Sequence, residues 1–192
     1  WGAMQSRADL IAFLDADDAY QANALLPVIA AFHFLPFLSL VRLKLTPVDL
    51  ATRYAQHPDL AKAWDILQMT VGGNMIFRRN LFLASGGFPQ DDLFRTLGGE
   101  DVSLGIAFAE TTAVGTLFAE HDAGVLHYCR DGMHAERLLD AYLFQQHDPR
   151  ITPEAQQYAA QTTQRIKQNL QTLMPILQHG KAGRTPLTMQ FE

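Results

Sequence analysis

Cysteine is scarce in this sequence, and Cys129 is the only one. A single cysteine excludes an intramolecular disulfide framework and is typical of a reducing compartment, so we expect a cytoplasmic location. Positive charge is also low, because 15 Lys and Arg face 20 Asp and Glu and leave a formal net charge of -5. The chain therefore lacks the basic footprint of a nucleic-acid-binding protein, and we expect no nucleic-acid partner.

Charged residues are absent from Ala19 to Val41. This length would suffice for a membrane-spanning helix, which needs about 20 apolar residues. However, Pro27 and Pro36 each remove a helical hydrogen bond. We therefore expect a buried helix that ends at Pro36 and a buried strand after it, rather than a span.

A second notable run is Leu10–Leu14, which leads directly into Asp15, Asp17 and Asp18. The apolar run predicts a strand buried on both faces. The acids then follow its carboxyl end, which is the edge where open α/β sheets bind ligands. Clustered carboxylates repel one another unless a divalent cation or a set of donors balances them, so we expect a metal and nucleotide-phosphate site. The alternative is an acidic first turn of a helix.

Apolar periodicity and turn residues predict alternating strands and helices, typical of an α/β fold with a mixed sheet flanked by helices. The hydrophobic content of 48% suffices for one core, so we expect a single domain. The expected helices are 18–34, a stretch from Thr46-Pro47, 60–69, 81–84, 102–108, 133–144 and a long one that Thr152 caps. The expected strands are 37–45, half exposed at Arg42 and Lys44, then 75–77, 114–118 and 124–128, with a frayed tail from about His179.

Further candidate side chains follow glycines or lie near the last strand. Glu100 and Asp101 follow Gly98-Gly99, where a carboxylate can act as a general base or can simply cap a helix. Arg130 can bind a phosphate through two nitrogens or pair with a nearby acid, Asp131 or Glu136. Three histidines are possible metal ligands, although a lone histidine is more often a hydrogen-bonded structural residue. They are His121, His127 and His134.

The order of these motifs resembles one family. Asp15-Ala16-Asp17-Asp18 comes first, then Gly73-Asn74-Met75-Ile76-Phe77-Arg78-Arg79, then Gly86-Gly87-Phe88, then Gly99-Glu100-Asp101-Val102. From about Gly2 to Arg130 this pattern is similar to the family-2 glycosyltransferases, which have the nucleotide-diphospho-sugar transferase (GT-A) fold. The resemblance implies that residues 1–150 form the C-terminal part of a GT-A domain without the N-terminal nucleotide-binding half, and that residues 151–192 add an amphipathic helix and a tail.

The resemblance also implies roles for particular residues. Asp15 and Asp17, the D-x-D acids, would bind Mn²⁺ or Mg²⁺ and the sugar nucleotide, and His127 would complete the metal site. Asp101, beside Glu100, would deprotonate the acceptor hydroxyl in an inverting transfer from a nucleotide-diphosphate sugar. The acceptor would be a glycan, a lipid or a small molecule. Because half of the donor site would lie outside this stretch, we expect the isolated chain to bind donor weakly or to be inactive.

Two other functions fit parts of the sequence. A strand that ends in Asp-x-Asp also opens haloacid-dehalogenase-type phosphatases, in which the first acid, here Asp15, is the nucleophile. The second alternative is a non-catalytic transferase remnant whose helices serve in assembly with other proteins. Its long helix, Glu154 to about Met174, could pack on its own core, on a partner or peripherally on a membrane surface, and we favour its own core.

Overall fold

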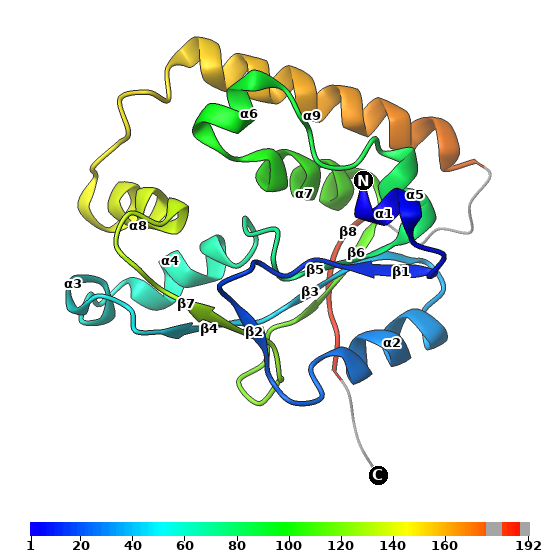
Figure 1. Ribbon diagram of the computed structural model, residues 1–192, viewed down its shortest axis with the longest axis horizontal. Helices are drawn as coiled ribbons and strands as arrows, with labels where there is room; N and C mark the ends of the chain where they lie inside the picture. Colours follow the sequence, from blue (N-terminus) through cyan, green and yellow to red (C-terminus); the bar gives the residue numbers. More distant parts are fainter. Residues whose placement is uncertain (176–181, 189–192) are drawn as a thin grey trace.

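The structure is a computed structural model that describes residues 1–175 and 182–188. It is an α/β fold with two mixed sheets (Figure 1). The strands are β1 (Leu10–Ala12), β2 (Ala19–Tyr20), β3 (Leu38–Leu43), β4 (Leu45–Val48), β5 (Met75–Arg78), β6 (Ala113–Leu117), β7 (Val125–Tyr128) and β8 (Gly183–Pro186). The helices are α1 (Gly2–Gln5), α2 (Leu25–Phe34), α3 (Thr52–Ala55), α4 (Leu60–Leu67), α5 (Arg79–Ala84), α6 (Asp92–Leu97), α7 (Glu100–Thr111), α8 (His134–Phe144) and α9 (Pro153–Leu173).

The larger sheet has the strand order β1-β5-β3-β6-β8, and the smaller has the order β2-β7-β4. In the larger sheet β5 runs antiparallel to β1 and β3, whereas β3, β6 and β8 are parallel. The chain passes from the larger to the smaller sheet at Lys44, between β3 and β4. The two sheets therefore meet near the ends of β1 and β5, where the acids lie.

Two buried clusters cover opposite faces of the larger sheet. One contains Val28 and Phe32 of α2, and the other contains Phe77, Phe108 and Ile166 from β5, α7 and α9. Figure 1 shows α5, α7 and α9 above the sheet and α2 below it. The prediction that the long C-terminal helix packs on the chain's own core is therefore confirmed.

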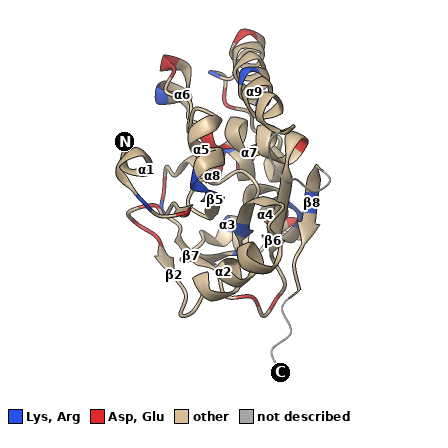
Figure 2. Ribbon diagram, turned by 90° about the vertical axis from the view of Figure 1, so that its right-hand side faces the viewer, with Lys and Arg blue, Asp and Glu red and all other residues tan. Residues whose placement is uncertain are grey.

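Several predicted elements are confirmed with shifted ends. Thr152 accepts a hydrogen bond from the Ala155 amide, as expected for the cap of α9. The uncharged stretch forms α2 and β3, and α2 is uncharged along its length (Figure 2). Among the described residues, no helix is long and apolar enough to cross a membrane.

The first strand was predicted wrongly as buried on both faces. Among the described strands β1 lies at the edge of its sheet and pairs with β5 alone, so Leu10 and Ile11 are half buried and Ala12 is exposed. The helix expected from Asp18 begins only at Leu25. Ala19 and Tyr20 instead pair with β7, because the Asp18 carboxylate is bound to that strand rather than to a helix terminus.

The segment around Thr46-Pro47 was also predicted wrongly as a helix start. It belongs to β4, whose residues run parallel to β7. Pro47 is tolerated there because β4 is the edge of its sheet, where a strand can do without one amide. The expected half exposure at Arg42 is wrong as well, since its side chain is fully buried and hydrogen-bonded.

The C-terminal tail is not simply frayed. Gly183–Pro186 form β8, which pairs in parallel with β6, and Leu187 is buried. The Gly183 amide donates to the Thr112 carbonyl and the Leu187 amide to the Thr116 carbonyl, so both ends of β8 are tied to the sheet. The rest of the expected tail, 179–181 and 189–192, lies outside the described residues.

Candidate active site

Asp15 and Asp101 each contact one glycine of the pair Gly72-Gly73. The Gly72 amide donates to Asp101 Oδ2 at 3.0 Å. On the next residue, a Cβ built on Gly73 would lie 3.0 Å from Asp15 Oδ2 and 3.3 Å from the Asp15 amide nitrogen. The loop thus brings together two carboxylates that are far apart in the sequence, and a side chain at either glycine would make the contact tight.

Asp101 is held at the start of α7. Gly98 and Gly99 have φ values of +71° and +90°, in the left-handed region that glycine favours, and they turn the chain into the helix. The Asp101 carboxylate accepts from the amides of Val102 and Gly72. Burial, with a smaller effect from the adjacent Glu100 charge, raises its pKa to about 6. The two amide contacts are those expected of an acid near a helix start, and the general-base role stays a prediction.

Asp15 is the first acid after β1, and the Asp18 amide closes a turn by donating to its carbonyl. Partial desolvation raises the pKa of Asp15, and the charges of Asp18, Asp17 and Glu100 raise it further, whereas His127 lowers it. Glu100 is therefore close enough to influence Asp15 electrostatically. The two predicted acid clusters are therefore coupled electrostatically through Asp15 and Glu100.

Asp17 and Asp18 point to different partners. Asp17 Oδ2 lies 2.7 Å from Arg130 in a pair that is exposed to solvent. Arg130 was expected to bind phosphate or to pair with Asp131 or Glu136, and here it pairs with Asp17. The Asp18 carboxylate is fully buried and accepts from the Tyr128 amide at 3.1 Å.

Of the three candidate histidines, only His127 joins the acids. Its Nδ1 lies 2.8 Å from Asp18 Oδ2, and its Nε2 is buried with no hydrogen-bond partner among the described residues. His134 instead lies against Gly98 near the start of α8, and His121 is exposed in the turn before β7. A histidine held by a carboxylate through one nitrogen, with its other nitrogen free, is arranged as metal-bound histidines are.

The residues present fit a cation only in part. Within residues 1–175 and 182–188, no group of three or more His, Cys, Asp or Glu side chains is placed to hold a metal ion. Mg²⁺ commonly uses one or two carboxylates and completes its shell with water and substrate phosphates. The excess of carboxylates around Asp15 suits such shared binding, in which Asp15 and Asp17 would supply the protein ligands.

Sequence reasoning did not find the role of Arg42. Its Nη1 donates to the Val71 carbonyl at 2.9 Å and to Asn74 Oδ1 at 3.0 Å, so it ties down both ends of the glycine pair. Burial lowers the pKa of Arg42 to about 9, and a Cβ on Gly105 would overlap its guanidinium. One indication of this role was present in the sequence, an arginine within an otherwise mostly apolar strand.

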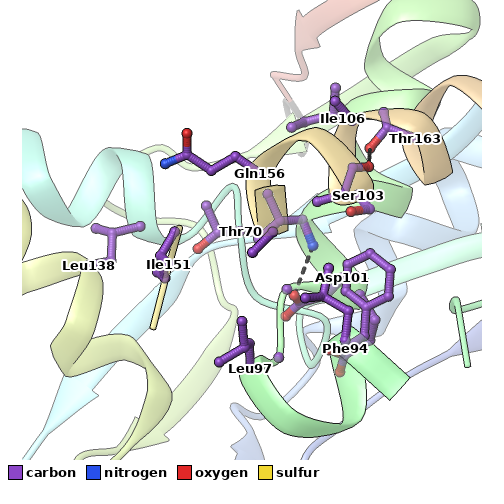
Figure 3. A pocket seen from close by; sticks show the side chains of 18 of the residues that line it. Thr70, Phe94, Leu97, Asp101, Ser103, Ile106, Leu138, Ile151, Gln156 and Thr163 are labelled. Atoms are coloured by element: carbon purple, nitrogen blue, oxygen red, sulfur yellow. Dashed lines mark hydrogen bonds between the residues drawn. The ribbon is translucent and has the colours of Figure 1, made fainter. Parts of the chain in front are cut away.

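A cavity of about 780 Å³ opens beside Asp101, between the first turn of α7 and the helices α8 and α9 (Figure 3). Its lining includes Glu100 and Asp101, but not Asp15 or Asp17. The predicted base thus faces a pocket, whereas the predicted donor-binding acids lie outside it. Comparisons of the chain with models of known protein families and with curated proteins find no match.

Proposed function

We propose that the chain is the catalytic part of a metal-dependent, inverting glycosyltransferase of the family-2 type, with a partial GT-A fold. The observation that carries the proposal is the contact of Asp15 and Asp101 with the same Gly72-Gly73 loop. The D-x-D and Gly-Glu-Asp motifs are distant in sequence, and a common site is what this reaction requires of them. The mixed α/β architecture is compatible with the GT-A fold.

In this proposal Asp101 is the base. A hydroxyl nucleophile must lose its proton as it attacks the anomeric carbon, and a carboxylate with a pKa of about 6 is deprotonated at neutral pH and still basic. Two amide donors fix its orientation, one from α7 and one from the glycine loop. The acceptor hydroxyl would approach from the cavity side.

Asp15 and Asp17 have the role of donor-binding acids. The chemistry that a divalent cation supplies when bound is neutralisation of the charge on a leaving diphosphate. Arg130 already reaches Asp17 and could exchange that exposed contact for a phosphate oxygen. Asp18 would orient His127 through Nδ1, and Nε2, which is unpaired among the described residues, would be the nitrogen left for a further ligand.

The test is release of nucleoside diphosphate from a panel of UDP- and GDP-sugars with Mn²⁺. Asp101→Asn should lower the rate at least about 100-fold, the low end of what a general base contributes. Asp92→Asn, in the neighbouring helix and outside that carboxylate's contacts, is the matched control and should retain activity. Hydrolysis of small phosphoesters that Asp15→Asn abolishes, with no action on nucleotide sugars, would instead support a phosphatase.

A further inference from the structure

The cavity beside Asp101 has an apolar interior. Its walls come from the turn before α7, from α7 itself and from α8 and α9, and its volume of about 780 Å³ is in the range of small-molecule sites. Figure 3 shows apolar side chains from the turn before α7, from α7 and from α8, together with the polar Gln156 and Thr163 of α9. The apolar lining residues include Leu97, Ile106, Leu138, Ile151 and Ala159.

Two of these residues are unusually exposed for their type. Ile106 is 42% and Ile151 44% accessible, although both belong to the cavity wall. Exposed apolar surface that gathers in a concave site is a marker of ligand binding. A ligand with an apolar body would cover these side chains and gain the free energy of removing them from water.

The charged side chains of the wall argue against an anionic ligand. Lys167 Nζ is already 2.6 Å from Glu110 Oε2, and Arg137 donates to the Leu97 carbonyl and faces Asp148. Glu100 and Asp101 add negative charge at one end. A neutral ligand with a hydroxyl is therefore favoured over a phosphate or a carboxylate, because the hydroxyl can donate to an aspartate.

From this arrangement we propose that the cavity binds the acceptor, and that the acceptor is a neutral alcohol with an alkyl or aryl body. The apolar body lies against Ile106 and Ile151, and the hydroxyl lies at Asp101. This inference rests on the proposed transferase function and names its acceptor class. It selects, among glycan, lipid and small-molecule acceptors, those with an uncharged apolar portion next to the reacting hydroxyl.

The experiment measures binding to the full chain by calorimetry, without nucleotide or metal. The probe is n-octyl β-D-glucopyranoside below its micelle concentration, with D-glucose as the comparison. The octyl glucoside should bind saturably and at least tenfold more tightly than glucose. Ala159→Trp, which fills the cavity, and Ile106→Asn, which makes its wall polar, should each weaken binding at least tenfold.

The matched control is Ile29→Asn on α2, an exposed isoleucine on the opposite side of the larger sheet. It should leave the affinity within twofold of wild type. The inference is overturned if octyl glucoside binds no more tightly than glucose, or if Ile29→Asn weakens binding as much as Ile106→Asn. Since no nucleotide is present, failure here leaves the metal and donor site untouched, and failure of donor binding leaves this result standing.

Discussion

The Gly72 amide donates a 3.0 Å hydrogen bond to Asp101 Oδ2, and this contact joins the glycine loop to the first turn of α7. The same loop touches Asp15 through Gly73. A donor-binding acid and a base must be held at a fixed separation for an in-line displacement, because small errors in position reduce the rate strongly. The loop between them is therefore the element whose disturbance should affect function most.

Gly73→Ala tests the loop directly. The new Cβ would meet Asp15 at 3.0–3.3 Å, so Asp15 must move. We expect at least tenfold weaker binding of UDP or GDP with Mn²⁺, measured by calorimetry. Gly2→Ala in α1, where a Cβ meets nothing within 4 Å, should leave binding unchanged, and equal affinity of both variants would contradict the geometry.

Alanine substitution of Asp18 should reduce stability much more than alanine substitution of its neighbour Asp17. Asp18→Ala leaves the His127 ring nitrogen and the Tyr128 amide without their partner, so it should cost about 2–3 kcal/mol of unfolding free energy. Asp17→Ala removes only an exposed pair with Arg130 and should cost less than about 1 kcal/mol, while it reduces metal-dependent nucleotide binding. Denaturant titration of both variants checks this, and equal destabilisation would refute it.

The stability of the protein should depend on pH through Asp101. Its pKa rises from an ordinary value of 3.8 to about 6 on folding, so the folded state holds this proton more tightly. Its contribution to stability is thus fully present below pH about 4 and is lost as pH rises through about 6, by up to about 3 kcal/mol. As pH rises from about 4 through about 6, the unfolding free energy of the wild-type protein should fall by up to this amount relative to that of Asp101→Asn. A difference that stays constant with pH would contradict a raised pKa.

Arg42→Met should affect the site from a distance. It removes the hydrogen bonds to the Val71 carbonyl and to Asn74, at a cost of about 1–3 kcal/mol, and it frees the glycine loop. We expect lower kcat and a shifted pH profile, because the loop no longer fixes Asp101. Arg78→Met is the matched control, since Arg78 binds the Leu38 and Phe32 carbonyls away from this loop. A similar stability loss with unchanged kcat is expected for it, and identical kinetics of both variants would exclude the positioning role.

The sequence predicted the alternation of elements well where periodicity was strong. The Thr152-Pro153 start of α9 and the strand at Met75 are examples, because their information is local. The edge position of β1 and the pairing of β4 with β7 could not be predicted, since they depend on strand order. Pro47 favoured a helix start in isolation, and an edge strand accommodates it equally well.

For the site, the order of the motifs predicted that Asp15 and Asp101 serve one reaction. It could not predict that both contact the Gly72-Gly73 loop. The partner of His127 could not be predicted from the sequence either, because Asp18 reaches it from just before β2, the strand that pairs with β7. Arg42 was expected at a half-exposed strand end, and only the contacts of its guanidinium with the loop explain its burial. Each of these facts depends on packing between segments that are distant in the chain.

The most direct test of the central claim is calorimetric binding of UDP and GDP to the full chain with and without Mn²⁺. Weak binding is expected of this chain, but one of the two nucleotides should bind at least tenfold more tightly with Mn²⁺ than without it, and Asp15→Asn should remove this gain while Asp92→Asn retains it. Affinities that are the same with and without Mn²⁺ for both nucleotides, in a protein that is folded by circular dichroism, would contradict it.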